Sequence, residues 1–345
     1  MTVRTGKKFL DVLAGQVVAP PPIWMMRQAG RHLPEYLETR ARARDFLDFC
    51  YTPSLASEAT LQPIRRYGMD GAILFADILL ILDAMGLGVR FEKGEGPLVE
   101  TISAASDLAR VKPQAAADKL SSVYETVARV KAQLPKETAL IGFAGSPWTV
   151  TLYAVEGRGK TDKSAAWRWA HGRPDELAAA MDLVSEATAQ YLARQVEAGA
   201  DALMLFDSWA EGLADNIFEE VIIAPTKRLV ARVRELGVTV PIIGFPRGAG
   251  VMLPAYVKAT GVTGVGLDTA ASPVFINREL SANFPVQGHL DPLLLIEGGG
   301  RLDARVDQLL DAYRGRPHIF NLGHGVRPET PIANVERVIN RIRKG

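Results

Sequence analysis

Apolar residues gather along the chain in short runs bounded by Gly, Pro or Asp. Most of these runs show no polar alternation, which is typical of strands buried on both faces of a parallel sheet. Eight runs fit this description, at residues 23–27, 72–76, 139–143, 202–206, 242–245, 264–267, 284–287 and 318–321. The pattern therefore predicts eight strands.

Helical periodicity separates these runs. Apolar residues recur at spacings of three and four in two clear sets, Leu120, Val123, Val127, Val130 and Leu134, and Ile332, Val335, Ile339 and Ile342. Each set would bury one helical stripe against a sheet. Strand and helix in alternation, counted to eight, predict an α/β protein with a closed (β/α)8 TIM barrel. A doubly wound open sheet is the alternative.

One segment departs from this alternation. Residues 86–101 read GLGVRFEKGEGPLVET, and their turn glycines and alternating residues predict a small hairpin that decorates the barrel. No linker of low complexity and no repeat of solenoid length interrupts the chain, so residues 1–345 are expected to form a single domain.

Composition narrows the possible partners. Forty Lys and Arg against 39 Asp and Glu leave a net charge of +1, which provides no general field for nucleic acid or an anionic membrane. The one cysteine, Cys50, has no partner for an internal disulfide, which favours a reducing compartment, and we expect a cytoplasmic protein. No window approaches the roughly 18 uncharged apolar residues of a membrane span.

Polar groups stand where the predicted strands end. In a barrel the carboxyl ends of the strands converge on one face, and the active site lies there. The groups at these ends are Arg27, Asp77, residues 145–149, Asp207 with Ser208, Arg247, Asp268 and residues 321–325. The sequence therefore predicts a site at this face.

Arg27 and Arg31 flank the glycine-containing turn formed by residues 28–30. This spacing lets both guanidinium groups face one cavity and bind carboxylate or phosphate oxygens, and Arg40 adds a third charge. Ordinary surface ion pairs are the alternative role for such arginines. A phosphorylated substrate also stays open, because the last loops of this fold often bind phosphate.

Asp77 interrupts an apolar stretch, so its carboxylate must be paired, hydrogen-bonded or raised in pKa. It would hold a cationic or NH-rich ligand, or else cap a helix or pair with an arginine. Tyr153 and Ser208 are candidate hydroxyl donors, and His324 between two glycines is a candidate donor to an anion. Core or capping roles are the alternatives for these three.

Motifs for metals and nucleotides are absent from the sequence. The five histidines form no HExxH or similar cluster, and there is no GxxxxGK[ST] loop. We therefore expect neither a metal nor an organic cofactor.

Several of these segments resemble one known family. Residues 22–36 (PIWMMRQAGRHLPEY), 142–157 (GFAGSPWTVTLYAVEG) and 321–325 (NLGHG) are similar to the signatures of the uroporphyrinogen decarboxylase family. Residues 60–67 and 72–79 extend the match over nearly the whole chain in the expected order. His32 stands where the family usually has Tyr.

The resemblance implies a barrel enzyme, a homodimer without metal or organic cofactor, that converts the acetates of uroporphyrinogen III to methyls and yields coproporphyrinogen III. It implies catalytic roles for Asp77, Arg27 and Tyr153. The substrate-binding residues that it implies are Arg27, Gln28, Ala29, Gly30, Arg31, Arg40, Asp77, Tyr153, Ser208 and His324.

Two other functions stay open. Relatives in the same superfamily use zinc to transfer methyl groups to or from corrinoid or thiol partners. Such zinc sites usually need cysteine and histidine ligands, and this sequence has a single cysteine. A non-catalytic tetrapyrrole carrier would use the same arginines and would release no CO2.

Overall fold

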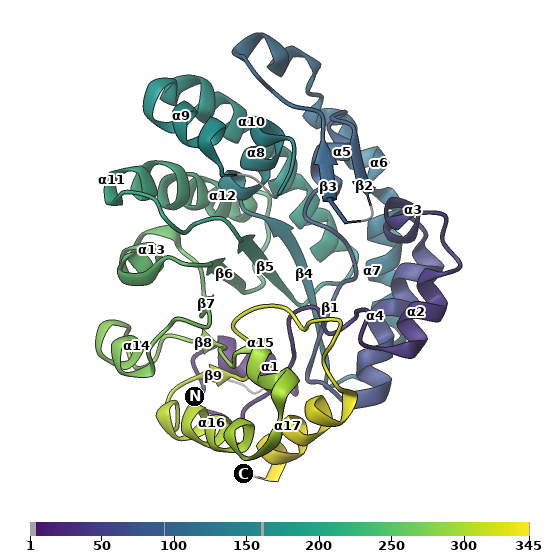
Figure 1. The fold of residues 1–345 in the computed structure, drawn as a ribbon, viewed down its shortest axis with the longest axis vertical. Helices are drawn as coiled ribbons and strands as arrows, with labels where there is room; N and C mark the ends of the chain where they lie inside the picture. The colour runs from purple at the N-terminus through teal and green to yellow at the C-terminus, as the bar shows by residue number, and fades with distance from the viewer. Residues whose placement is uncertain (1–4, 93, 160–161, 345) are drawn as a thin grey trace.

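A computed structural model describes residues 5–92, 94–159 and 162–344 of the chain. At its centre lies a parallel sheet of seven strands that curls around the middle of the molecule (Figure 1). These strands are β1 (Gly71–Ile73), β4 (Ala139–Gly145), β5 (Ala202–Asp207), β6 (Ile242–Pro246), β7 (Gly264–Gly266), β8 (Val286–Gln287) and β9 (His318–Ile319).

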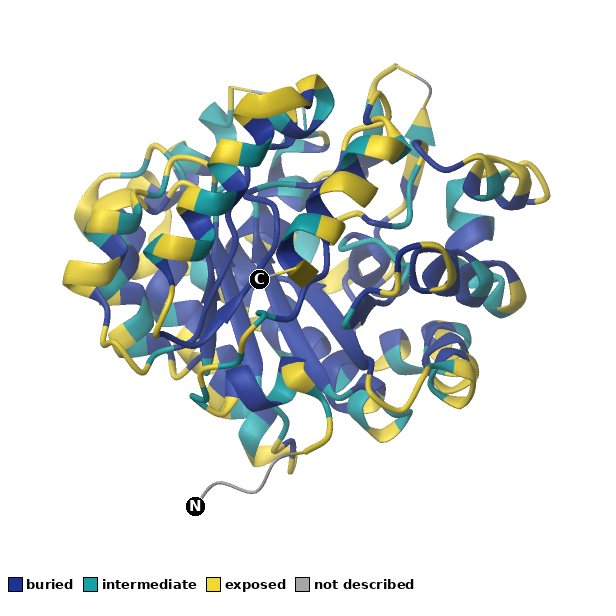
Figure 2. Ribbon diagram, turned by 90° about the horizontal axis from the view of Figure 1, so that it is seen from below, coloured by how far each residue is buried: buried dark blue, intermediate teal, exposed yellow. Residues whose placement is uncertain are grey.

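The sheet is buried on both faces, as the unbroken apolar runs predict. Every residue of β4, β5 and β6 is buried, and the strands stand dark blue inside a shell of helices with exposed outer faces (Figure 2). The neighbouring strands pair in parallel register, with Ile141 opposite Ala202 and Phe206 opposite Phe245. Seven of the eight predicted runs thus correspond to strands, with bounds that differ by a few residues.

The strand order follows the chain without reversal, from β1 through β4, β5, β6, β7 and β8 to β9. A doubly wound sheet would reverse its order at a switch point, so the doubly wound alternative is wrong.

The first predicted strand, residues 23–27, is also wrong as a strand. Ile23 makes only an isolated bridge with Phe320, while its carbonyl accepts the Asp70 N–H at 2.8 Å on the other side. A ladder of hydrogen bonds between strands cannot extend beyond this bridge, because side chains accept the hydrogen bonds of the next backbone N–H groups. The Gln28 Oε1 atom accepts the Met25 N–H, and the Asn321 Oδ1 atom accepts the Met26 N–H.

Helices form the outer layer. They are α1 (Lys8–Leu13), α2 (Pro34–Arg40), α3 (Phe46–Tyr51), α4 (Pro53–Tyr67), α5 (Leu80–Ala84), α6 (Ala116–Lys119), α7 (Ser121–Gln133), α8 (Pro147–Glu156), α9 (Ser164–Gly172), α10 (Pro174–Glu197), α11 (Asp215–Phe218), α12 (Ala224–Glu235), α13 (Leu253–Thr260), α14 (Pro273–Glu279), α15 (Pro292–Glu297), α16 (Gly299–Ala312) and α17 (Ile332–Lys344). The two periodic stretches of the sequence correspond to α7 and α17. No described helix is long and apolar enough to cross a membrane.

The segment predicted as a hairpin contains two further strands, β2 (Val89–Glu92) and β3 (Gly96–Val99), which pair antiparallel beside α3 and α5. Lys93 between them lies outside the described residues.

Candidate active site

The segment that carries Arg27 is fixed to the loop that carries His324. The Asn321 Oδ1 atom accepts the Met26 N–H at 2.9 Å, and the Met26 carbonyl accepts the Val326 N–H at 2.8 Å. Arg27 itself has a φ of +59°, a left-handed conformation that non-glycine residues rarely adopt. These bonds hold that conformation at the carboxyl end of β9.

Glycines in the same loop allow two close approaches. A Cβ on Gly325 would overlap the aliphatic part of the Arg27 side chain, with Cγ at 2.7 Å. A Cβ on Gly323 would lie 2.8 Å from the Thr269 Cα, just beyond β7. Only glycine lets the loop lie between Arg27 and the end of β7.

His324 is a neutral hydrogen-bond donor in this arrangement. Burial, together with the nearby charges of Arg27, Arg247 and Arg327, lowers the pKa of His324 to about 4. Its Nδ1 atom accepts the Gly325 N–H at 2.6 Å, so the remaining proton of the neutral ring is on Nε2. His324 can therefore donate to a carboxylate without carrying a charge of its own.

Asp77 follows β1 and is half-buried. The Phe75 N–H, two residues earlier, donates to the Thr60 hydroxyl of α4 at 2.9 Å and fixes this segment. The Oδ1 atom of Asp77 accepts the Leu79 N–H at 2.8 Å. Burial raises the pKa of Asp77, and the Leu79 N–H and the Arg27 guanidinium oppose that rise. Arg27 and Asp77 therefore lie within electrostatic range of each other.

Tyr153 belongs to the same cluster. Its helix α8 begins with a proline in the first turn and ends just before Gly157, which has a left-handed φ of +73°, so both ends of the helix are defined locally. Burial raises the pKa of Tyr153; the charge of Asp77 raises it further, and that of Arg27 lowers it. The structure thus brings Arg27, Asp77, Tyr153 and His324 together.

Ser208 is half-buried in the loop after β5. A buried hydrogen-bond chain fixes this loop: the Trp209 N–H donates to the Thr149 hydroxyl, which donates to the Asp207 Oδ1 atom at 2.5 Å. Burial raises the pKa of Asp207 to about 7. Asp207 therefore ties Ser208 to α8, and with it to Tyr153.

Gln28 lies beneath the cluster, with 1% of its surface exposed. Its Nε2 atom donates to the Gly71 carbonyl at 3.1 Å, and its Oε1 atom accepts the Met25 N–H. The side chain thus joins the Arg27 segment to β1. The neighbouring Ala29 and Gly30 are half-buried in the turn that follows.

Arg31 and Arg40 flank the cluster. Burial raises the pKa of Tyr36 to about 12, even though the nearby charges of Arg40 and Arg31 oppose that rise. The Tyr36 ring contacts Phe75, two residues before Asp77, with centroids 5.7 Å apart. Within the described residues, no ion pair holds Arg31 or Arg40.

Residues that the sequence did not single out as binding groups also lie here. Arg247 donates from Nη1 to the Ser208 carbonyl at 2.9 Å and pairs with Glu211. Asp207 and Arg247 stand at predicted strand ends, so their positions were the signal that could have selected them. Glu211 carries no such signal, because it lies inside a loop.

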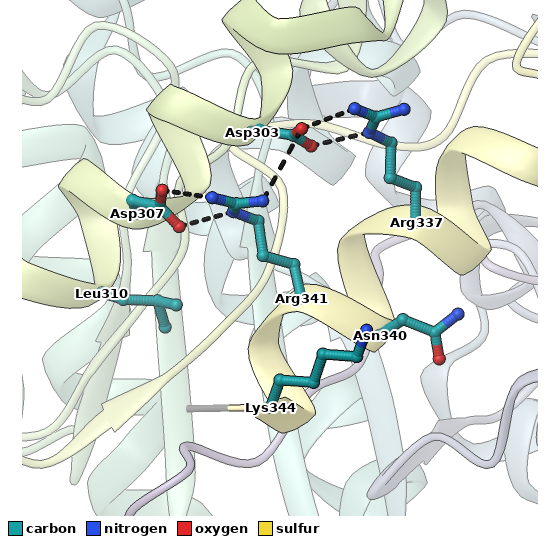
Figure 3. Close-up of a pocket in the computed structure, with 7 residues that line it drawn as sticks. All are labelled: Asp303, Asp307, Leu310, Arg337, Asn340, Arg341 and Lys344. Carbon is teal, nitrogen blue, oxygen red and sulfur yellow. Dashed lines mark hydrogen bonds and ion pairs between the residues drawn. The ribbon is translucent and has the colours of Figure 1, made fainter.

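A separate surface hollow lies between α16 and α17 (Figure 3). Arg337 pairs there with Asp303 and Arg341 with Asp307, and none of the predicted site residues lines it. Exposed ion pairs of this kind contribute little energy. Across residues 5–92, 94–159 and 162–344, no group of three or more His, Cys, Asp or Glu side chains is arranged to hold a metal ion.

The fold and the strand-end cluster define the class: a parallel α/β protein whose strand ends carry arginine, a neutral histidine and a half-buried carboxylate. The model of the family uroporphyrinogen decarboxylase (URO-D) matches residues 4–345. The chain belongs to the uroporphyrinogen decarboxylase family.

Two relatives illustrate the similarity. The chain is 82% identical over 337 residues to the uroporphyrinogen decarboxylase of Hyphomonas neptunium, with 98% of each chain covered. It is 52% identical to that of Maricaulis maris, with 99% of each covered. Among solved structures, a methyltransferase from Methanosarcina mazei superimposes with a TM-score of 0.81 at 18% identity, over 98% of this chain and 97% of the other. That likeness concerns the fold alone.

Proposed function

We propose that this protein is a uroporphyrinogen decarboxylase, which converts the four acetate side chains of uroporphyrinogen III to methyls and produces coproporphyrinogen III for tetrapyrrole synthesis. The observation that carries the proposal is the proximity of Asp77 to Arg27 at the strand ends, beside the neutral His324. The identity of 82% to a relative of that name supports it across the chain.

The chemistry needs an electron sink. Breaking the bond between an acetate methylene and its carboxylate leaves an electron pair that the pyrrole ring itself can accept once it is protonated. A proton adds to the ring carbon that bears the bridge, CO2 leaves, and the pair forms an exocyclic double bond. A second proton then completes the methyl group, and the ring carbon loses its extra proton. Each cycle consumes one proton in total.

Asp77 is the group proposed to stabilise the cationic ring. Its carboxylate accepts the pyrrole N–H groups and lies where positive charge develops, which is the general logic of electrostatic catalysis. Burial raises the pKa of the free carboxyl. Pyrrole N–H donors and the transient cation favour the ionised form and bring that pKa down.

The remaining residues bind and orient the carboxylates. Arg27 contacts the reacting acetate, and the Nε2–H of His324 donates to a neighbouring carboxylate. Tyr153 and Ser208 supply hydroxyls to the same ligand. Arg31 and Arg40 bind further acid groups, Ala29 and Gly30 line the turn between the arginines, and Gln28 supports that turn from below.

We also infer a single (β/α)8 barrel, in which residues 22–24 take the place of the first strand. The bonds of this segment to Phe320 on one side and Asp70 on the other support that closure. A homodimer and a cytoplasmic location are further parts of the proposal.

Anaerobic incubation with uroporphyrinogen III tests the function. We expect coproporphyrinogen III and four equivalents of CO2 without any added cofactor. Tight binding without CO2 release would indicate a carrier instead. Stoichiometric zinc in the purified protein, with methyl transfer in place of decarboxylation, would indicate the methyltransferase alternative.

A further inference from the structure

Glu211 lies between two basic residues from neighbouring loops. Its Oε1 atom is 2.8 Å from the Lys163 Nζ atom, and its Oε2 atom is 3.3 Å from the Arg247 Nη1 atom. Gly248, with a left-handed φ of +80°, lets the loop after β6 pack against Glu211, since a Cβ there would clash with the Glu211 backbone and Cβ. One carboxylate thus joins the loops that follow α8, β5 and β6.

This group adjoins the strand-end cluster. The charges of Arg247 and Glu211 both act on His324, in opposite directions. Arg247 donates to the carbonyl of Ser208. The Lys163 Nζ atom lies 4.4 Å from the centre of the Trp209 ring, which makes a T-shaped contact with the Tyr153 ring.

Arg247 keeps binding capacity in this arrangement. Only its Nη1 atom donates to groups in the described part of the chain, which leaves the Nε and Nη2 donors available. Its side chain is 33% exposed and that of Glu211 is 34% exposed. An ion pair with this exposure is weak, so a second carboxylate can compete for the guanidinium.

We propose that Arg247 is a further substrate-binding residue, which Glu211 neutralises in the free protein and which takes up a carboxylate of the bound tetrapyrrole. The proposal rests on the proposed function, because the ligand must carry acid groups around its whole rim. Uroporphyrinogen carries an acetate and a propionate on every ring. Arg27 and Arg31 lie in the segment that precedes β1, whereas Arg247 follows β6, which β4 and β5 separate from β1 in the sheet.

Steady-state kinetics of Arg247→Gln test this role. We expect KM for uroporphyrinogen to rise about 10-fold while kcat stays within about twofold, because one charge-assisted contact made in both ground and transition states is lost. Arg247→Lys should recover part of the loss. Glu211→Gln should lower KM, because it frees the guanidinium before the substrate arrives.

Arg232→Gln is the matched control. Arg232 is 40% exposed and pairs with Glu186 on the outer helices, away from the cluster, so KM and kcat should both stay unchanged. Thermal unfolding of each variant shows whether it is folded.

A purely structural Arg247, acting through the Ser208 carbonyl, would reduce kcat and leave the Glu211→Gln variant with an unchanged or higher KM. Either result, or an unchanged KM in Arg247→Gln, overturns the inference while the wild type still turns over. No turnover by the wild type would refute the proposed function itself.

Discussion

At the scale of single residues, Asp77 is the group on which the proposed chemistry depends most. Asp77→Asn keeps the size of the side chain and its bond from the Leu79 N–H, but it removes the charge opposite the cationic ring. We expect kcat to fall about 100-fold or more, the order seen when a fixed electrostatic contact to a transition state is lost. Stopped assays of coproporphyrinogen formation measure it, and an unchanged kcat in a folded variant would remove Asp77 from the mechanism.

The sequence was informative about such residues only where an abrupt change of polarity marks them. Asp77 stands out because it ends an apolar run, and Arg27 because it precedes a glycine-containing turn. The role of Gln28 in substrate binding stays a prediction, and what the fold adds is that its amide also bonds two backbone groups. Glu211 could not be selected from the sequence, because its role depends on loops that are distant in sequence and meet only in the fold.

At the scale of elements, the segment of residues 23–27 explains where the pattern fails. Its apolar residues predict a strand, yet side chains of Gln28 and Asn321 take the N–H groups that a ladder would use. The apolar pattern correctly predicted that this segment is buried, but it wrongly predicted that the N–H groups of the segment pair with a neighbouring strand. Amide side chains distant in sequence cannot be matched to backbone donors before the fold is known.

Asn321 is the residue that should hold this segment to the loop of residues 321–325. Its Oδ1 atom accepts both the Met26 and Leu322 N–H groups inside the core. Asn321→Ala leaves both donors unpaired, and we expect a loss of about 2 kcal/mol in the free energy of unfolding. Urea denaturation measures it. The exposed Asn216→Ala serves as control, and equal stability of the two variants would contradict this role.

At the scale of the whole molecule, the alternation of strands and helices predicted the sheet because burial on both faces leaves a strong apolar signal. Strand ends were less predictable: the run at residues 284–287 corresponds to a strand of only Val286–Gln287. Strand length depends on which neighbour supplies hydrogen bonds, a property of the assembled sheet and not of the local sequence.

Buried and partly buried histidines make the stability of the whole molecule depend on pH. Burial lowers the pKa of each of four histidines to about 4, namely His32, His289, His318 and His324. In the unfolded chain each has a pKa near 6.5, so between about pH 6.5 and 4 that chain binds protons that the folded protein excludes. Stability should therefore fall as the pH falls through this window.

Asp207 acts in the opposite sense, because burial raises its pKa to about 7 and the folded protein keeps a proton that the unfolded chain releases. One such carboxyl offsets only part of the effect of four histidines. We expect the free energy of unfolding to drop by about 2 kcal/mol or more between pH 7 and pH 5, as measured by urea denaturation. His318→Gln should flatten this slope, whereas the exposed His171→Gln should leave it unchanged. A stability that is constant or rises on acidification would show that these rings take up protons inside the fold.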